Sequence, residues 1–414
     1  MDTKQYIDRP QYMHLLDSYR GSEHIKVLQG IRRCGKSSLL EMLRAHLLTE
    51  GVPERNIYRK RFDEFGLPLE FTAQQLTTEL QQMLRQSDDS QMRYVFLDEI
   101  QEVRDWPKVV RGLHTLGNVD VYITGSNAHL LSTDLATALA GRTTTIDVHP
   151  LSFGEYLEFT RTSFPDRARL SHDELFADYV RFGGMPTLFA LREFTQEGIA
   201  RELDSVYNSV ILRDVAQHLQ IRDISLLNRL VAYLFSTSGN LFSTRKIVGA
   251  LTSGGLKTSA EPVETSIDGL MRAFILFEAT QFGLRGKNML NPLRKFYAED
   301  CGLRNIATGF SSQDYGFQLE NVVATELRRR GFDVHVGSLR SGEIDFVAQR
   351  FDSRIYIQVT ETMLDETTRT RELAPLQAVH DSFPKIVLTL DRFRLGTTTD
   401  GIEIRNIVDW LLDS

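Results

Sequence analysis

Residues 25–45 read IKVLQGIRRCGKSSLLEMLRA, and this stretch decides the fold of the first part of the chain. A short apolar run, Ile25 to Leu28, leads into the spacing Gly-x4-Gly-Lys-Ser and then into a helical pattern. This strand–loop–helix context predicts a phosphate-binding loop, because the two glycines let successive backbone N–H groups close around an anion at the positive end of the helix. The alternative is a glycine-rich turn that binds no nucleotide.

The loop supplies specific chemistry if it holds a nucleotide. Lys36 is predicted to reach the β- and γ-phosphates, and Ser37 to offer its hydroxyl to Mg²⁺. Arg32 and Arg33 are placed to meet phosphate or a lid. Cys34 is either an oxidation switch or simply a small residue that the loop tolerates. The predicted nucleotide-binding set is Gly30, Ile31, Arg32, Arg33, Cys34, Gly35, Lys36, Ser37 and Ser38.

A second motif, RYVFLDEIQ at residues 93–101, complements the loop. Four apolar residues, 94–97, predict a buried strand that ends in two carboxylates. Asp98 is predicted to bind Mg²⁺ directly or through water. Glu99 is predicted to polarise the attacking water, which marks a hydrolase. The alternative is a pair of acids at the favoured end of a helix.

Two further segments carry candidate catalytic residues. The predicted strand VDVYITGSN, 119–127, ends in Ser126 and Asn127, which are candidates for contact with the γ-phosphate or the water. Arg142 follows a short helical pattern and a glycine. There an arginine could enter the site of a neighbouring subunit and stabilise transition-state charge. The alternative is a helix-ending arginine beside a capping glycine.

Five segments together carry a resemblance: GIRRCGKSSLL, FLDEIQEVRDW, ITGSNAHLLS, LAGR and PLSFGEYL. In this order and spacing they resemble the prokaryotic AAA-type ATPases of the archaeal-ATPase-like group, which carry a C-terminal module of unknown function behind a winged helix. The resemblance implies an α/β ATPase core that uses ATP with Mg²⁺ and often forms oligomers. It also places Arg9 and Pro10 where related ATPases contact adenine.

Length and composition limit the number of domains and the class of protein. A chain of 414 residues is expected to form two to three domains. It has no apolar run long enough to span a bilayer and no signal-peptide layout at its N-terminus, so a cytoplasmic protein without membrane partners is expected. Two distant cysteines, Cys34 and Cys301, do not support a disulfide framework or a Cys-rich zinc site. A net charge of −7 argues against coating nucleic acid with the whole surface, but leaves a local basic patch open.

The middle of the chain has a helical pattern from about 170 to 220, broken by a Gly/Pro turn at 182–186 and ending in an expected long helix at 205–221. Helical patterns at 225–236, 242–255 and 261–280, the last running into a strand, precede a two-stranded ribbon. This order is typical of a winged helix. Candidate nucleic-acid contacts are Lys257, Arg272, Arg285 and Lys287. The third helix also carries Glu261, Glu264 and Asp268, which repel phosphate, so a protein-binding role stays open.

The last part contains GEIDFVAQRFDSRIYIQVTETM at 342–363, preceded by a predicted helix with Glu320. Its helix, three strands, helix and strand resemble the PD-(D/E)xK nuclease fold. Glu320 and Asp345 take acidic positions, but Gln358 and Thr360 stand where a carboxylate and a lysine are needed. Glu343 faces with Asp345 and could supplement it, and no nearby residue is expected to replace the lysine. The predicted site is therefore degenerate.

Taken together, the sequence predicts an α/β chain with four parts: a P-loop ATPase core (1–165), a helical adaptor (166–222), a winged helix (223–300) and a nuclease-like domain (301–414). The leading hypothesis is an oligomeric, Mg²⁺-dependent ATPase that binds ATP and ADP. Its C-terminal half would couple nucleotide state to single-stranded, duplex or branched DNA. The alternatives are a nucleotide-dependent switch that holds a protein partner, and an ATP-linked nuclease.

Overall fold

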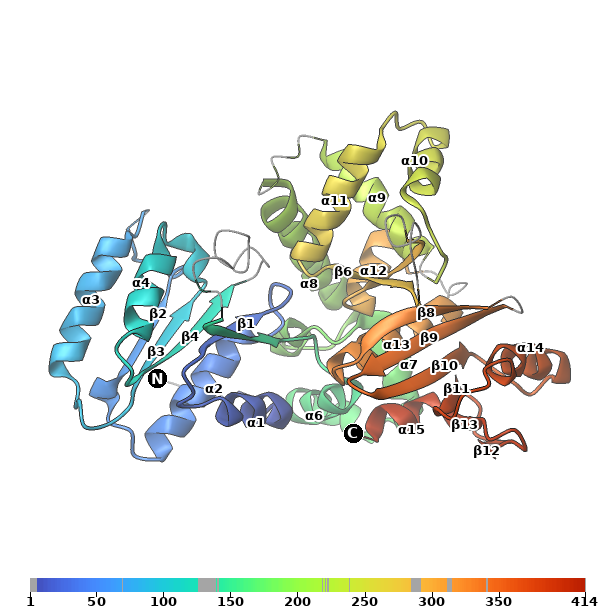
Figure 1. Cartoon of the computed structure of the whole chain (residues 1–414), viewed down its shortest axis with the longest axis horizontal. Coiled ribbons are helices and arrows are strands. Elements are labelled where there is room, and N and C mark those ends of the chain that lie inside the picture. Colours follow the sequence, from blue (N-terminus) through green and yellow to red (C-terminus); the bar gives the residue numbers. More distant parts are fainter. Residues whose placement is uncertain are drawn as a thin grey trace. The chain divides into compact units, whose positions relative to one another are not determined.

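The chain folds into two compact units, Met1–His149 and Pro150–Ser414, shown in Figure 1. The computed structural model describes residues 6–68, 70–125, 139, 141–217, 219, 221, 223–237, 239–283, 292–310, 315–339 and 342–413. Among these residues no helix is long and apolar enough to cross a membrane.

The first unit is built on a parallel five-stranded sheet with the order β2-β3-β4-β1-β5. Its strands are β1 (Ile25–Gln29), β2 (Ile57–Arg61), β3 (Arg93–Asp98), β4 (Val119–Gly125) and β5 (Thr143–Asp147). β1 and β3 are buried along their whole length, which explains why both are rich in apolar residues, although β1 also buries Lys26. The strands predicted at 25–28 and 94–97 are confirmed.

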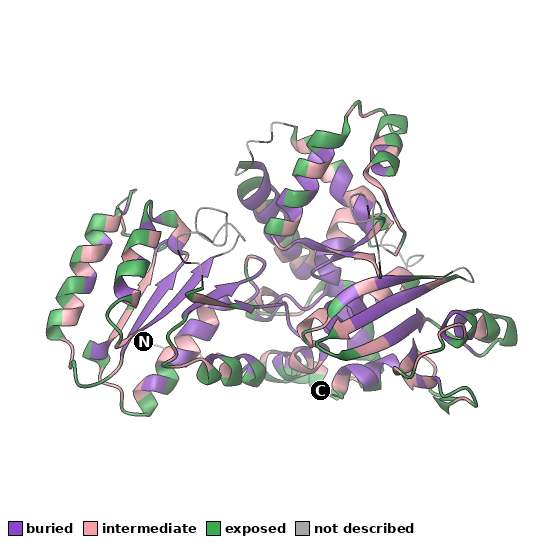
Figure 2. Ribbon diagram, in the orientation of Figure 1, coloured by how far each residue is buried: buried purple, intermediate pink, exposed green. Residues whose placement is uncertain are grey.

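Helices cover both faces of this sheet. The helical elements are α1 (Pro10–Ser18), α2 (Lys36–Thr49), α3 (Ala73–Gln86) and α4 (Trp106–His114), with short 3₁₀ turns at Glu54–Asn56 and Ile100–Glu102. α3 and α4 pack Leu80 and Val110 against Val95 and Ile123 of the sheet. Side chains of opposite parity, such as Phe96, are buried on the other face of the sheet, as alternation along a strand requires. Figure 2 shows the buried strands and the exposed outer sides of α3 and α4.

The second unit begins with helices that start at side-chain caps. The helical elements are α6 (Phe153–Ser163), α7 (His172–Phe182), α8 (Gln196–Ser209), α9 (Ile224–Ser236), α10 (Thr244–Ser253), α11 (Ala260–Arg272) and α12 (Cys301–Thr308), with 3₁₀ turns at Pro165–Arg169 and Pro186–Ala190. Ser152 and Ser171 form capping boxes with the glutamate three residues on. α7 ends at Phe182, and Gly183 has φ 77°, so the predicted Gly/Pro break is confirmed. The helix predicted at 205–221 is instead the end of α8 followed by a π-helical segment, Val210–Gln217.

A mixed eight-stranded sheet, with the order β12-β13-β11-β10-β9-β8-β6-β7, completes the second unit. The strands are β6 (Leu276–Gln281), β7 (Arg294–Ala298), β8 (Asp333–Leu339), β9 (Gly342–Arg350), β10 (Ser353–Thr360), β11 (Lys385–Thr389), β12 (Gly396–Thr397) and β13 (Glu403–Asn406). The accompanying helices are α13 (Tyr315–Arg329), α14 (Glu366–Gln377) and α15 (Ile407–Leu412).

The predicted ribbon of the winged helix is part of this same sheet. β6 and β7 pair antiparallel, and β6 also pairs parallel with β8 through Thr280 and His335. Pairing with β8 satisfies backbone groups that a free ribbon would leave at a sheet edge. α9, α10, α11, β6 and β7 thus follow the predicted order, but their ribbon is continuous with the C-terminal strands.

Candidate nucleotide site

The loop between β1 and α2 has the backbone that its two glycines were predicted to allow. Gly30 has φ 146° and Gly35 has φ 106°. A Cβ on residue 30 would lie 2.1 Å from the carbonyl oxygen of Val148, so a side chain does not fit there. Arg33, a non-glycine residue, also has a positive φ of 66°. Both glycines are therefore needed for the loop to turn between strand and helix.

Lys36 lies inside this loop. Its Nζ donates to the carbonyl oxygens of Gly30 at 2.8 Å and Ile31 at 3.1 Å, and only 4% of the residue is exposed. Cys34 is buried, and its Sγ lies 3.9 Å from the same Nζ. Of the other predicted loop residues, Arg33 is exposed, and the partly exposed ones are Arg32, Gly35, Ser37 and Ser38.

Ser37 and Asp98 lie together at the carboxyl edge of the sheet. Ser37 Oγ donates to Asp98 Oδ1 at 3.0 Å, and Thr124 Oγ1, at the end of β4, donates to the same oxygen. Burial raises the pKa of Asp98, and the hydrogen bonds from Thr124 and Ser37 oppose that rise. Hydroxyl and carboxylate oxygens are the ligands that Mg²⁺ prefers, so these residues fit the ion.

Glu99 is held next to this cluster in an uncommon backbone conformation. It has φ 54° and ψ 46°, in the left-handed region. Its backbone N–H donates to Thr124 Oγ1 at 3.0 Å, and Gln101 Nε2 donates to its side-chain Oε2. The hydrogen bond from Gln101 restrains the carboxylate of Glu99, whose charge lies close enough to help raise the pKa of Asp98.

The sequence did not indicate three residues at this edge: Thr124, Gln101 and Arg61. Arg61 pairs in register with Asp98, and its Nε lies 3.9 Å from Asp98 Oδ2. Its Nη2 donates to Asp63 at 3.0 Å. Only their positions could have pointed to Arg61 and Thr124, since these residues lie at or near the ends of the two strands that flank β3.

Arg9, the residue before α1, donates hydrogen bonds to the loop and to the segment after β5. Its Nη1 donates to the carbonyl of Cys34 at 3.0 Å and its Nη2 to that of His149 at 3.1 Å, and 2% of the residue is exposed. Pro10 is the exposed first residue of α1. Their contact with adenine stays a prediction.

Arg142 lies at the other edge of the sheet. It directly precedes β5, whose Thr143 pairs with Ile25 at the start of β1, whereas the loop follows Gln29 at the end of β1. Its side chain is exposed. Ser126 and Asn127, the other two catalytic candidates, lie outside the described residues.

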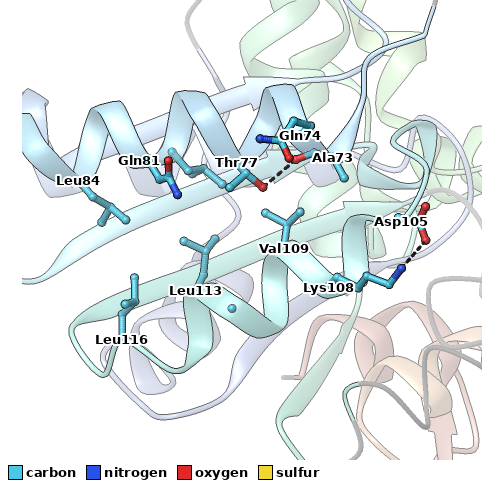
Figure 3. A pocket seen from close by; sticks show the side chains of 12 residues that line it. Ala73, Gln74, Thr77, Gln81, Leu84, Asp105, Lys108, Val109, Leu113 and Leu116 are labelled. Carbon is cyan, nitrogen blue, oxygen red and sulfur yellow. Dashed lines mark hydrogen bonds and ion pairs between the residues drawn. The ribbon is translucent and has the colours of Figure 1, made fainter.

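A pocket of about 430 Å³ opens between α3 and α4 of the first unit, as Figure 3 shows. Its apolar lining includes Leu84, Val109, Leu113 and Leu116. None of the predicted site residues lines it, so it is separate from the phosphate loop.

Two of the four predicted nucleic-acid contacts can be placed, and they lie at opposite ends of α11. Lys257 precedes α11 and Arg272 is its last residue, and both are exposed. Arg285 and Lys287 lie outside the described residues. The two described candidates are therefore separated by the length of the helix.

The nuclease-like residues are partly brought together. Asp345 N donates to Gln358 Oε1 at 3.3 Å, and Glu320 lies in the same charged cluster. Thr360, at the end of β10, donates to the carbonyl of Thr362 instead. The expectation that nothing nearby in the sequence replaces the missing lysine stays a prediction, but Lys295 of β7, distant in the sequence, lies 3.6 Å from Glu320 Oε2.

A parallel sheet with a glycine-rich loop after β1 and an acid pair after β3 defines the P-loop class of nucleotide-binding proteins. The comparisons with known proteins agree. The family described as an AAA domain matches residues 22–157, and a domain of unknown function matches residues 173–314. An AAA domain implies nucleotide binding.

Two relatives match most of the chain. An uncharacterized protein of Haemophilus influenzae is 36% identical over 410 residues, which are 99% of this chain and 100% of that protein. An uncharacterized protein of Methanocaldococcus jannaschii is 30% identical, over 84% of this chain and 77% of its own length. The chain belongs to the same family as these two proteins.

One solved structure shares the fold. A Walker-type ATPase of Pyrococcus abyssi superposes with a TM-score of 0.52 at 16% identity, over 73% of this chain and 96% of its own. At this identity the match shows the fold alone.

Proposed function

We propose that this chain is a Mg²⁺-dependent ATPase. One observation carries the proposal: the hydroxyls of Ser37 and Thr124 converge on Asp98, and Glu99 follows at the same edge of the sheet. This edge is also where the glycine-rich loop leaves β1, so phosphate, metal and water would meet within reach of one another.

Each residue has a role in this proposal. Lys36 and the loop N–H groups bind the β- and γ-phosphates, and Ser37 with Asp98 would hold Mg²⁺. The ion supplies neutralising charge to the phosphate oxygens. Glu99 orients and polarises the attacking water, with Gln101 and Thr124 fixing its position.

Two substitutions separate binding from hydrolysis. Lys36→Ala is expected to abolish or severely weaken ATP binding, because the phosphates lose the cation of the loop. Glu99→Gln should bind ATP normally and hydrolyse it about 10²- to 10⁴-fold more slowly, since it keeps the shape but loses the base. Glu102→Gln, an exposed acid in the next turn, is the matched control and should hydrolyse at the wild-type rate.

Phosphate release and calorimetric ATP binding measure these effects. Normal hydrolysis by Glu99→Gln would show that another group activates the water. Unchanged ATP binding by Lys36→Ala would contradict the assignment of the loop.

A second element of the proposal is that the C-terminal unit couples nucleotide state to DNA. The order of α9, α10, α11, β6 and β7 supports it, because a winged helix places its third helix in the major groove. Hydrolysis should then be stimulated by single-stranded, duplex or branched DNA at low salt.

The competing function is a switch that holds a protein partner. It is favoured by the acidic net charge of −7 and by exposed acids on α11, including Glu261 and Asp268. If hydrolysis depends on Glu99 but no form of DNA changes its rate, the result would favour the protein-binding switch.

A further inference from the structure

The acidic centre of the C-terminal sheet surrounds a lysine from a distant part of the chain. Lys295 of β7 forms an ion pair with Glu343 Oε1 of β9, and its Nζ lies 3.6 Å from Glu320 Oε2 of α13. Its side chain is 1% exposed. Three segments therefore meet at one buried ammonium group.

The remaining polar groups of this centre bond to the protein. Asp345 Oδ2 accepts from the backbone N–H of Val359 at 2.8 Å. Gln358 Nε2 donates to Glu372 Oε2 at 3.0 Å. Tyr297 donates its hydroxyl to Glu320 at 3.4 Å. The amide that replaces a nuclease carboxylate is thus committed to internal hydrogen bonds.

Charge balance also depends on the lysine. Burial alone would lower the pKa of Lys295, but Glu320, Asp345 and Glu343 outweigh it and raise that pKa. Burial raises the pKa of both Glu320 and Asp345. Uncompensated carboxylates at these positions would be costly, and the ammonium offsets them. Among the described residues, no group of three or more His, Cys, Asp or Glu side chains is arranged to hold a metal ion.

We propose that Lys295 provides the positive charge of this centre. The centre then holds the sheet together as a structural ion-pair cluster without a metal ion, and does not act as a nuclease site. Lys295 supplies the positive charge that a divalent ion supplies in a nuclease. This ion-pair cluster connects β7 to α13 and β9.

The neighbouring residue on β7 supports this structural role. Arg294 bonds to Glu264 of α11 at 2.6 Å and to Glu278 of β6 at 3.0 Å. Side chains alternate along a strand, so β7 is tied by ion pairs on both of its faces. The hairpin therefore links the winged-helix-like helices to the nuclease-like strands as a fixed element.

The test is Mn²⁺ binding to the full-length protein without nucleotide, in an Asp98→Asn background that removes the other metal-binding candidate. With Lys295 present, Mn²⁺ should neither bind at this centre nor shift the thermal midpoint. Lys295→Met should lower the midpoint of the second unit by on the order of 10 °C and gain stabilisation by Mn²⁺. Arg294→Met, which removes the adjacent cation, should gain no response to Mn²⁺.

Other variants keep the proposal testable if Lys295→Met does not fold. Combining Lys295→Met with Glu320→Gln and Glu343→Gln removes the lysine and both of its paired carboxylates, and should recover folding relative to the single change. Three results would overturn the proposal: Mn²⁺ bound with Lys295 in place and lost in Glu320→Gln, Mn²⁺-dependent DNA cleavage lost in Asp345→Ala, or Lys295→Met with an unchanged midpoint.

Discussion

Replacing Arg142 with alanine tests whether two subunits share one nucleotide site. The strand register places this arginine before Thr143, opposite Ile25, while the phosphate loop begins after Gln29. The five residues of β1 therefore lie between Arg142 and the start of the loop, a distance of about 16 Å along the strand at the usual rise per residue. An extended arginine side chain is shorter than that, so Arg142 cannot serve the loop of its own chain.

If Arg142 completes the site of a neighbour, Arg142→Ala should lower the turnover of ATP by about 10³-fold or more and leave ATP binding intact. Mixing then gives a sharper result. A subunit with Lys36→Ala lacks a working loop but still offers Arg142 to its neighbour. In equal mixtures with Arg142→Ala, about one interface in four joins an intact loop to an intact arginine, so hydrolysis should partly return.

The assay is steady-state phosphate release, with sedimentation at the same protein concentration to record assembly. Arg111→Ala, an exposed arginine in the last turn of α4, is the matched control and should leave turnover unchanged. Normal turnover by an assembled Arg142→Ala protein would refute the shared site. So would a mixture that stays inactive although its subunits co-assemble.

The other predictions concern the site and the stability of each unit. Thr124→Val should slow hydrolysis at least about tenfold with little loss of ATP binding in a binding assay, because Asp98 and the backbone of Glu99 lose a shared partner. Burial raises the pKa of Asp300 from 3.8 to about 6. The neutral carboxyl should therefore stabilise the folded state fully below pH 4, and this stabilisation should be lost as the pH rises through 6. Up to about 3 kcal/mol of unfolding free energy is involved, and Asp300→Asn should lack this pH dependence in urea unfolding. Lys26→Met should cost the first unit about 3–5 kcal/mol in the same assay, because Asp120 keeps a buried charge without its partner.

Much of the first unit could be predicted because its signals are local. The loop, its lysine and its serine follow one another within eight residues, and the apolar runs of β1 and β3 mark buried parallel strands. The acid pair after β3 could be assigned for the same reason. The backbone angles of Gly30 and Gly35 then agree with the requirement read from their spacing.

Thr124, Arg61 and Lys295 could not be predicted, because their positions depend on strand order. Thr124 meets Asp98 only because β4 lies beside β3. Lys295 reaches the acidic centre only because the β6–β7 hairpin joins the sheet beside β8. The cation of this acidic centre therefore comes from more than 60 residues upstream of Thr360, which no local pattern indicates.

The same ion pairs limit how the second unit can meet a partner. Arg294 and Lys295 are used internally, and Glu264, expected to repel phosphate, is bound by Arg294. Lys257 and Arg272 stay exposed at opposite ends of α11, about 20 Å apart along a helix of 13 residues. Two cations so far apart would contact two separate phosphates and give a shallow salt dependence, with a slope near −2 in log–log form. A steep salt dependence of DNA binding would instead require a basic surface formed by further residues, since Arg294 and Lys295 of β7 are already paired inside the unit.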